Sequence, residues 1–422
     1  MNLNFKGKKV FCSFNDFSNV EFINFINKLS ETNDVTIYTK NKFINNFFNK
    51  NIKIIISKIK IPFLYKLLHF FSKNKTSSLN SYYNIENIFL KNNFFVKILF
   101  LIRLILNFFN LPISKDILRD YFYKDKANIL NFDILLTDFR FNEIYSNHEI
   151  IYFAKKNNKP IVSILFSWDN VYSSDINLHA NFYIVGSKKL RIIVSKRNKI
   201  SLSKIRISKS FQFLSLSKKP INKNISFKYI LFACCVEENS QIAKEEFEII
   251  NFIGNYLEKS GSNIKVLVRP YPFFEKKINL SKKFLYSNIV VKDYGKKIIR
   301  RKIKDKFEYM RFEKSTDNKY ELIHNSIAVI NFFTTLGIES VFLKKFTLFL
   351  NIKSNKSNYI QYLNSHFFKV KYLNHYKILN GKSFYVNSIY ELSKKLDLII
   401  KNDVNLKLPT KDYEYFKNIF LK

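Results

Sequence analysis

Residues 326–350 read SIAVINFFTTLGIESVFLKKFTLFL, and they hold the local unit that is repeated along the chain. The first apolar run is rich in Ile, Val and Phe, which is typical of a buried strand, and it stops at Thr334 and Thr335. Beyond Gly337 a helical pattern opens at Ile338, and a second β-rich run closes the stretch. The pattern predicts a strand, a hydroxyl-bearing turn, a helix and a second strand, which is a βαβ unit.

The turn in this unit has the chemistry of a phosphate site. The hydroxyls of Thr334 and Thr335 and free backbone N–H groups would lie at the positive end of a helix. Glu339, expected in the first helical turn, could accept hydrogen bonds from a ribose. The same residues also suit a purely structural role, in which a threonine caps the helix and Glu339 complements its dipole. This stretch alone favours the structural role, because many α/β proteins contain such a turn.

Length and composition indicate the number of domains and the kinds of partner that the chain could have. The 422 residues are enough for two ordinary α/β domains. With 71 Lys and Arg against 33 Asp and Glu, the formal net charge is +38, which by itself indicates nucleic acid or an anionic membrane as partner. Lysine is spread over the whole length, and Lys, Asn, Ile and Phe all have A/T-rich codons. We therefore give the net charge little weight as evidence for a nucleic-acid partner, and we keep a preference for anionic surfaces as an expectation.

Cysteine usage indicates a reducing cytoplasm. Cys12, Cys234 and Cys235 have the spacing of neither a disulfide framework nor a metal site. The N-terminus lacks the uninterrupted apolar core of a signal peptide.

One region could lie against a membrane. No run of about 18 uncharged apolar residues occurs, and the nearest approach, residues 94–111, is broken by Lys97 and Arg103. The surrounding segment, residues 62–111, is rich in lysine and aromatic residues. That composition suits helices in a membrane interface, and a buried core helix explains it equally well.

Alternating strands and helices predict an α/β fold with two Rossmann-like parallel-sheet domains facing a cleft. A polar stretch over 214–226 is typical of a linker. We expect an N-terminal domain over 1–215, a C-terminal domain over 226–405 and a closing helix within 406–422. Ligands of open α/β sheets bind outside the carboxyl ends of the strands, so polar residues that follow strands are the candidates for a site.

Three aspartates follow strands of the first half. Asp16, Asp138 and Asp169 are candidate general bases for a sugar or glycerol hydroxyl. Each taken alone is more often a turn residue or a helix cap.

Arg269 is the strongest polar candidate of the second half. It ends a predicted strand, and Pro270 and Pro272 would fix its loop, so that the guanidinium forms a preorganised fork for phosphate oxygens. Pairing of Arg269 with a carboxylate such as Glu237 or Glu238 is an equally good interpretation.

Several motif classes are missing from the sequence. No H-E-x-x-H, Cys/His cluster, D-x-D triplet, Walker A loop or G-x-G-x-x-G fingerprint occurs at a suitable place. We therefore expect no metal and no bound cofactor.

Five segments, taken in order, resemble the bacterial GT-B glycosyltransferases of surface polysaccharide synthesis. They are residues 167–170 (SWDN), 186–187 (GS), 208–213 (SKSFQF), 269–272 (RPYP) and 334–339 (TTLGIE). CDP-glycerol glycerophosphotransferases and the UDP-GlcNAc 2-epimerase fold share this layout. The resemblance covers roughly residues 130–350, and Tyr271 stands where the family has a histidine.

The resemblance implies a nucleotide-sugar donor bound mainly by the C-terminal domain. Its implied donor contacts are Arg269, Thr334, Thr335 and Glu339, with Glu237 in addition. GT-B enzymes as a rule need no metal, since basic side chains and helix N-termini neutralise the leaving diphosphate. The implied base, in order of preference, is Asp169, Asp138 or Asp16.

The resemblance also implies an acceptor and a location. The acceptor would be a surface glycan or a lipid-linked saccharide of capsule or lipopolysaccharide synthesis. The enzyme would be cytoplasmic, and peripheral on the inner face of the membrane if residues 62–111 bind lipid. Polyol-phosphate transfer and sugar epimerisation on the same fold remain open. A nucleic-acid-binding protein is the alternative from another class, which the even spread of lysine disfavours.

Overall fold

The fold is given by a computed structural model that describes residues 5–14, 20–39, 47–56, 98, 131–139, 145–166, 180–208, 211, 225–234, 241–270, 283–292, 319–332, 334–352, 384–401, 409–411 and 413–414. The chain divides into two compact units. The first comprises Met1–Leu214 and Phe420–Lys422, and the second comprises Ser215–Ile419.

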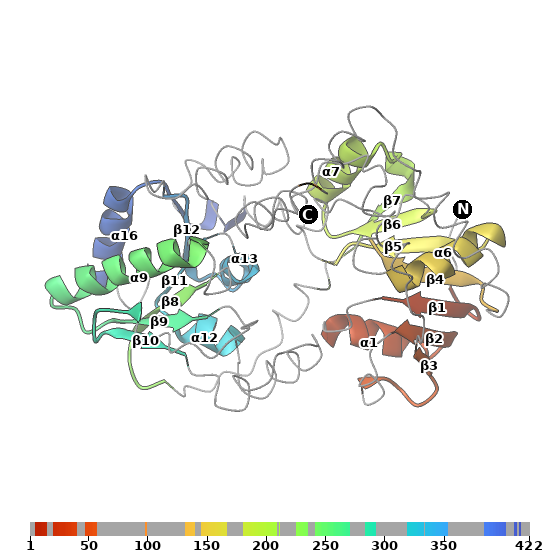
Figure 1. The fold of residues 1–422 in the computed structure, drawn as a ribbon, viewed down its shortest axis with the longest axis horizontal. Coiled ribbons are helices and arrows are strands. Elements are labelled where there is room, and N and C mark those ends of the chain that lie inside the picture. The colour runs from red at the N-terminus through yellow and green to blue at the C-terminus, as the bar shows by residue number, and fades with distance from the viewer. Residues whose placement is uncertain are drawn as a thin grey trace. The chain divides into compact units, whose positions relative to one another are not determined.

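The first unit is built on a seven-stranded sheet in the order β3-β2-β1-β4-β5-β6-β7 (Figure 1). All neighbouring strands in it are parallel. Its strands are β1 (Lys9–Ser13), β2 (Asp34–Thr39), β3 (Lys53–Ile56), β4 (Ile134–Asp138), β5 (Ile161–Ile164), β6 (Phe182–Val185) and β7 (Ile205–Ile207). Its helices are α1 (Val20–Leu29), α6 (Tyr145–Lys156) and α7 (Lys188–Asn198), with a 3-10 turn, η3 (Leu202–Lys204).

The strand order defines a topological switch point between β1 and β4. From β1 the chain moves outward through β2 to β3, and β4 then pairs with the free side of β1 before the chain continues outward to β7. β4 is fully buried, as expected for a parallel strand that is covered on both faces. Ser187, from the GS segment, caps α7 by accepting a hydrogen bond from the backbone N–H of Leu190.

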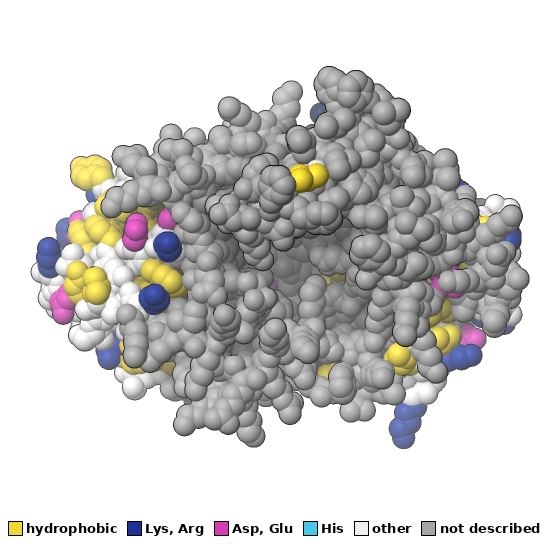
Figure 2. Space-filling view, viewed as in Figure 1, with side chains coloured by type: hydrophobic (Ala, Val, Ile, Leu, Met, Phe, Trp, Pro, Cys, Tyr) yellow, Lys and Arg dark blue, Asp and Glu magenta, His cyan; other side chains and the backbone are white. Residues whose placement is uncertain are grey.

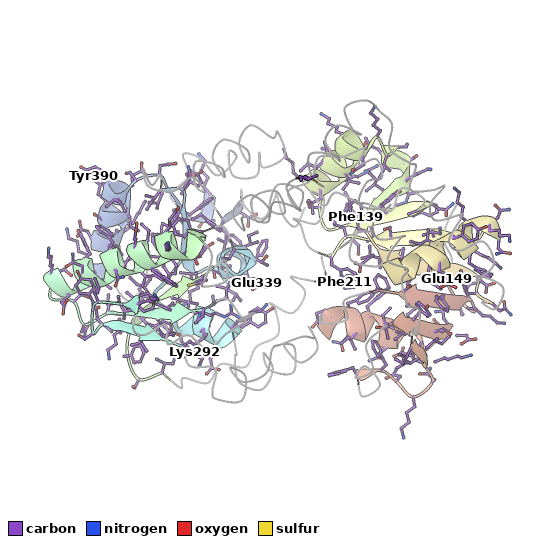
Figure 3. The ribbon with its side chains drawn as sticks, viewed as in Figure 1. Phe139, Glu149, Phe211, Lys292, Glu339 and Tyr390 are labelled. Carbon is purple, nitrogen blue, oxygen red and sulfur yellow. The ribbon has the colours of Figure 1, made fainter. Side chains whose placement is uncertain are left out.

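Aromatic rings pack beside the carboxyl edge of this sheet. Phe14 follows β1 and Phe166 follows β5, and both contact Phe22 of α1 with ring centroids 4.7 and 4.6 Å apart. Phe211, marked in Figure 3, packs on Phe22 at 5.3 Å and on Phe25 at 5.2 Å. The edge-to-face geometry of most of these pairs is the one that aromatic quadrupoles favour. The cluster ties α1 to two strand ends of the sheet.

The second unit is built on a six-stranded parallel sheet in the order β10-β9-β8-β11-β12-β13 (Figure 1). Here the switch point lies between β8 and β11. Its strands are β8 (Tyr229–Ala233), β9 (Lys265–Arg269), β10 (Ile289–Val291), β11 (Ala328–Asn331), β12 (Phe346–Leu350) and β13 (Tyr385–Val386). Its helices are α9 (Gln241–Lys259), α12 (Lys319–Asn325), α13 (Thr335–Phe342) and α16 (Ile389–Lys401).

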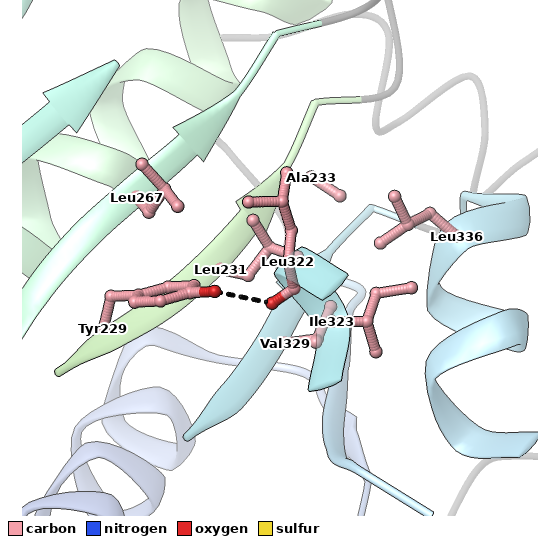
Figure 4. Close-up of a cluster of buried hydrophobic side chains, with 8 residues drawn as sticks. All are labelled: Tyr229, Leu231, Ala233, Leu267, Leu322, Ile323, Val329 and Leu336. Carbon is pink, nitrogen blue, oxygen red and sulfur yellow. Dashed lines mark hydrogen bonds between the residues drawn. The ribbon is translucent and has the colours of Figure 1, made fainter. Parts of the chain in front are cut away.

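A buried cluster joins this sheet to α12 and α13 (Figure 4). Leu322 and Ile323 of α12 and Leu336 of α13 pack with apolar side chains of β8, β9 and β11. Burial of each large aliphatic side chain contributes roughly 1.5–3 kcal/mol. The hydroxyl of Tyr229 donates a hydrogen bond to the carbonyl oxygen of Leu322 at 2.9 Å, and burial raises the pKa of this tyrosine. The cluster fixes both helices against the centre of the sheet.

The described surface carries mixed charge. On the face shown in Figure 2, the described lysine and arginine side chains lie among acidic and hydrophobic ones. None of the helices in the described part of the chain is long and apolar enough to cross a membrane.

The structure confirms the predicted fold class of two Rossmann-like parallel sheets and corrects details of the elements. The helix after β11 begins at Thr335, three residues earlier than expected, which puts Glu339 one turn into the helix. Four of the described elements were not predicted: η3, α12, β13 and α16. The cleft between domains stays a prediction, as do the predicted domain bounds. Residues 62–111, apart from residue 98, and most of the predicted closing helix lie outside the described residues.

Candidate functional site

Strand register places the candidate Arg269 in line with Asn331, the residue three positions before Thr334, at one edge of the sheet of the second unit. Arg269 is the register partner of Ala233, Ala233 is the partner of Asn331, and Asn331 is the partner of Phe349. These four residues form a row across the carboxyl ends of neighbouring strands. Since neighbouring strands lie about 4.8 Å apart, the backbones of Arg269 and Asn331 are about 10 Å apart. The row crosses the switch point, where open α/β sheets bind ligands.

Asn331, the last residue of β11, holds the turn that follows. Its side chain is fully buried. The amide oxygen accepts a hydrogen bond from the backbone N–H of Thr334 at 2.9 Å, and the amide nitrogen donates to the carbonyl oxygen of Leu348 at 3.2 Å. One side chain thus fixes the start of α13 to both β11 and β12.

Thr334 is the N-cap of α13. Its backbone is extended, and its hydroxyl accepts a hydrogen bond from the N–H of Gly337 at 3.0 Å. In the described part of the chain, the backbone N–H groups of Thr335 and Leu336 have no acceptor. The Thr334 hydroxyl therefore serves the helix, while the two N–H groups remain to bind an anion at the positive end of α13.

Gly337 is required where Asn331 packs against the first turn of α13. A Cβ atom built on Gly337 would lie 2.4 Å from both terminal atoms of the Asn331 side chain. Any larger residue would displace Asn331 and with it the bond that holds Thr334.

Glu339 carries a carboxylate into this buried environment. It is the fifth residue of α13 and is only 2% exposed. Its Oε1 atom lies 3.1 Å from Nζ of Lys319, whose side chain is 21% exposed. Figure 3 marks Glu339 on α13. Because side chains on a helix lean toward its N-terminus and residues four apart share a face, Glu339 lies on the same side of α13 as Thr335.

The contact between Lys319 and Glu339 follows from the topology. A helix that leads into a parallel strand runs antiparallel to it, so the first residue of α12, Lys319, lies at the carboxyl edge of the sheet. The first turn of α13 lies at the same edge because α13 follows β11. The pair therefore joins two helices that begin beside each other.

A second polar group lies at the end of β8 and β9. Cys234, Glu246 of α9 and Arg269 are all buried. Burial raises the pKa of the Cys234 thiol well above its ordinary value. The Glu246 carboxylate raises this pKa further, by repulsion and by accepting a hydrogen bond from the thiol, whereas the positive charge of Arg269 lowers it. Arg269 is thus a buried cation close to the Cys234 thiol, and Glu246 is a buried carboxylate close to the same thiol. The predicted carboxylate partners Glu237 and Glu238 lie outside the described residues.

Glu245, also on α9, is a buried carboxyl group with an unusual titration. Burial and, to a smaller extent, repulsion from Glu248 raise the pKa of Glu245 to about 7. Neither of its oxygens has a hydrogen-bond partner within the described chain. A group with a pKa near 7 takes up or releases a proton in the physiological range.

The first unit places a row of hydroxyls at its own switch point. Ser13, Thr137 and Ser163 are register partners on β1, β4 and β5, and all three are buried. Asp138, the candidate base that the structure describes, is the last residue of β4 and is buried, and the Ser163 hydroxyl donates to its carbonyl oxygen at 2.9 Å. Asp16, together with Asp169 and Glu237, lies outside the described residues.

Sequence reasoning missed three residues of the site: Asn331, Lys319 and Glu246. Asn331 carries a usable signal, since an asparagine three residues before a helix-capping threonine can bond the backbone of the turn. Lys319 and Glu246 carry none, because each meets its partners only through the sheet topology. Among the described residues, no group of three His, Cys, Asp or Glu side chains could hold a metal ion.

Comparison with known proteins identifies the fold. No family model matches the sequence, and no curated protein matches it. Among solved structures, a Listeria monocytogenes protein assigned as a UDP-N-acetylglucosamine 2-epimerase matches with a TM-score of 0.50 at 10% identity, covering 98% of this chain and 92% of that one. The chain therefore has the GT-B fold, as its sequence predicted.

Two further structures have lower scores. The UDP-GlcNAc 2-epimerase of Methanocaldococcus jannaschii matches with a TM-score of 0.49 at 13% identity over 98% of this chain and 96% of that one. The wall teichoic acid polymerase TagF matches with a TM-score of 0.47 at 11% identity over 100% of this chain and 85% of that one.

Proposed function

We propose that the protein is a glycosyltransferase that takes a sugar from a nucleotide-activated donor bound at the carboxyl edge of the second unit. The observation that carries this proposal is the start of α13. Two backbone N–H groups, those of Thr335 and Leu336, have no acceptor in the described chain, and the buried carboxylate of Glu339 lies on the same side of the helix. A diphosphate and a ribose are the two ligand groups that this pairing suits.

Each part of the donor would have its own contact. The phosphates would bind at the N-terminus of α13, where the helix dipole and the free N–H groups favour negative charge. Glu339 would accept hydrogen bonds from the ribose hydroxyls. Arg269, about 10 Å away along the edge, would add positive potential without forming an exposed fork, because it is buried.

An inverting displacement at the sugar would need one base. We keep Asp169, Asp138 and Asp16 as the candidates, in that order. Departure of the nucleoside diphosphate would be assisted by the same N–H groups that bind it, so basic groups and the helix terminus would do the work that a metal does elsewhere.

The proposed acceptor comes from the sequence resemblance. We propose a surface glycan or a lipid-linked saccharide, of the capsule or lipopolysaccharide kind, reached from the cytoplasmic face of a membrane. The lysine- and aromatic-rich residues 62–111 would supply the membrane contact.

Sugar epimerisation is the second candidate, because the solved structure with a TM-score of 0.50 is assigned to that activity. One experiment separates the two. The protein is incubated with UDP-GlcNAc, UDP-glucose, GDP-mannose and CDP-glycerol, with and without a membrane extract as acceptor, and the products are followed by proton NMR. Release of a free nucleotide that depends on the extract supports transfer. Conversion of UDP-GlcNAc to its 2-epimer without nucleotide release supports epimerisation instead.

A further inference from the structure

The ion pair between the partly exposed Lys319 and the buried Glu339 is not explained by helix stability. Lys319 is the first residue of α12. A cation at a helix N-terminus is opposed by the helix dipole. The first turn of α13 at the same edge adds a second positive end. The positive charge of Lys319 is therefore disfavoured by the dipoles of two helices. The nearby carboxylate of Glu339 offsets this cost.

Glu339 needs a counter-ion to stay charged. A carboxyl group that is 2% exposed loses most of its hydration, and burial favours its neutral, protonated form. In a protonated carboxyl group, one oxygen carries the proton and donates a hydrogen bond, so that oxygen is a poorer acceptor for a ribose hydroxyl. A carboxylate can accept hydrogen bonds on both oxygens, which is what two neighbouring hydroxyls of a ribose require.

Lys319 also reaches the surface of the unit. Its side chain is 21% exposed, and its Nζ lies 5.0 Å from the ring centroid of Tyr320 as well as 3.1 Å from Oε1 of Glu339. The ammonium group thus connects a buried carboxylate to the solvent-exposed side of the unit.

We propose that Lys319 is a positioning residue for nucleotide recognition: its ammonium group keeps the buried carboxylate of Glu339 ionised and fixed as the acceptor for the two ribose hydroxyls of the donor. This inference rests on the proposed function, because it assumes that a nucleotide binds at the start of α13. Lys319 acts through Glu339. Its removal therefore changes the preference of the site for a ribonucleotide over a dideoxynucleotide, as well as the affinity of the site for the nucleotide.

The test is the discrimination between a ribonucleotide and its 2′,3′-dideoxy analogue. Calorimetry is run with whichever of UDP, GDP or CDP binds the wild type best, and with the matching analogue, at pH 6 to 9. Loss of hydrogen bonds to a charged acceptor is expected to weaken wild-type binding of the analogue about 10- to 100-fold. Glu339→Gln should lose most of this preference at every pH.

Lys319→Met and Lys319→Arg separate charge from packing. Lys319→Met, of similar length, should lose most of the preference, because the positive charge 3.1 Å from the Glu339 carboxylate is removed while the length of the side chain is kept. Lys319→Arg should keep the preference throughout. Lys265→Met is the matched control, since Lys265 also places its nitrogen over a ring, 4.9 Å from that of Phe227, and begins β9 at the opposite edge of the sheet. It should behave as the wild type.

The outcomes distinguish the inference from the function on which it rests. If Glu339→Gln loses the ribose preference and folded Lys319→Met keeps it, the role of Lys319 is refuted while the donor site stands. If the wild type binds no nucleotide, or binds the ribonucleotide and its dideoxy analogue equally tightly, the proposed ribose contact itself is refuted. Circular dichroism of each variant confirms that binding is compared between folded proteins.

Discussion

The contact between Gly337 and Asn331 makes a sharp prediction about the turn that carries the site. Gly337→Ala places a Cβ atom 2.4 Å from both terminal atoms of the Asn331 side chain, against an ordinary contact distance of at least 3.4 Å. The amide must therefore move by about 1 Å. Because Asn331 is fully buried and hydrogen-bonded to the Thr334 N–H and the Leu348 carbonyl, this movement strains or breaks both bonds.

The magnitude follows from three contributions. Overpacking a core position costs about 1–3 kcal/mol, and each weakened hydrogen bond costs about 1 kcal/mol. The higher helix propensity of alanine offsets about 1 kcal/mol of this. We expect Gly337→Ala to lower the free energy of unfolding by about 2–4 kcal/mol, measured by urea denaturation followed by circular dichroism.

A second helical glycine provides the control. A Cβ atom on Gly254 of α9 would lie 2.6 Å from Cδ1 and 2.8 Å from Cγ1 of Ile289, and 3.2 Å from Oδ1 of Asn288, so that mainly an aliphatic side chain has to shift. Gly254→Ala should therefore cost less stability than Gly337→Ala, in which a doubly hydrogen-bonded amide has to move. Equal losses for the two variants, or a stable Gly337→Ala protein, would refute the claim that Asn331 is locked in place.

Three further outcomes follow from the described residues. Glu245→Gln should be more stable than the wild type by about 1–3 kcal/mol at pH 8, with the difference disappearing below pH 4.5, because the folded state binds a proton at Glu245 with a pKa of about 7 and the unfolded chain with the ordinary value of 4.5; denaturation curves that are parallel across pH would contradict this. Thr334→Ala should lose about 1 kcal/mol of stability and Thr334→Ser almost none, since only the alanine variant lacks a capping oxygen. The thiols of Cys12 and Cys234 should resist iodoacetamide at pH 8 in the folded protein and react in urea, because burial raises both pKa values; peptide mass spectrometry would show early labelling if this is wrong.

The sheets could be predicted because of how parallel strands are buried. Strands such as β8, β11 and β12 are covered on both faces, so each appears in the sequence as a continuous Ile-, Val-, Leu- or Phe-rich run. The order of such runs then fixes the α/β class. α16 was missed although Leu392, Leu396 and Ile399 repeat at helical spacing, so its pattern was available. α12 has seven residues and two buried ones, which is too short for periodicity to show.

The turn before α13 could be predicted from the sequence, whereas the contacts of its residues could not. Thr334, Thr335 and Glu339 could be proposed as candidates because a turn and a helix start are local in sequence. The partner of Glu339 is Lys319, 20 residues earlier and in another helix, and only the packing of α12 beside α13 brings the two together. For the same reason the sequence could not show that Arg269 is buried beside Cys234 and near Glu246.

The central claim is that a nucleotide binds at the start of α13. Isothermal titration calorimetry with UDP, GDP, CDP, CMP and dTDP, on the wild type and on Glu339→Gln, tests this directly. We predict that one diphosphate binds the wild type and binds Glu339→Gln at least tenfold more weakly, since the variant loses a charged acceptor. Folded wild-type protein that gives no heat with any of the five nucleotides, or a variant that binds as tightly as the wild type, would contradict the assignment.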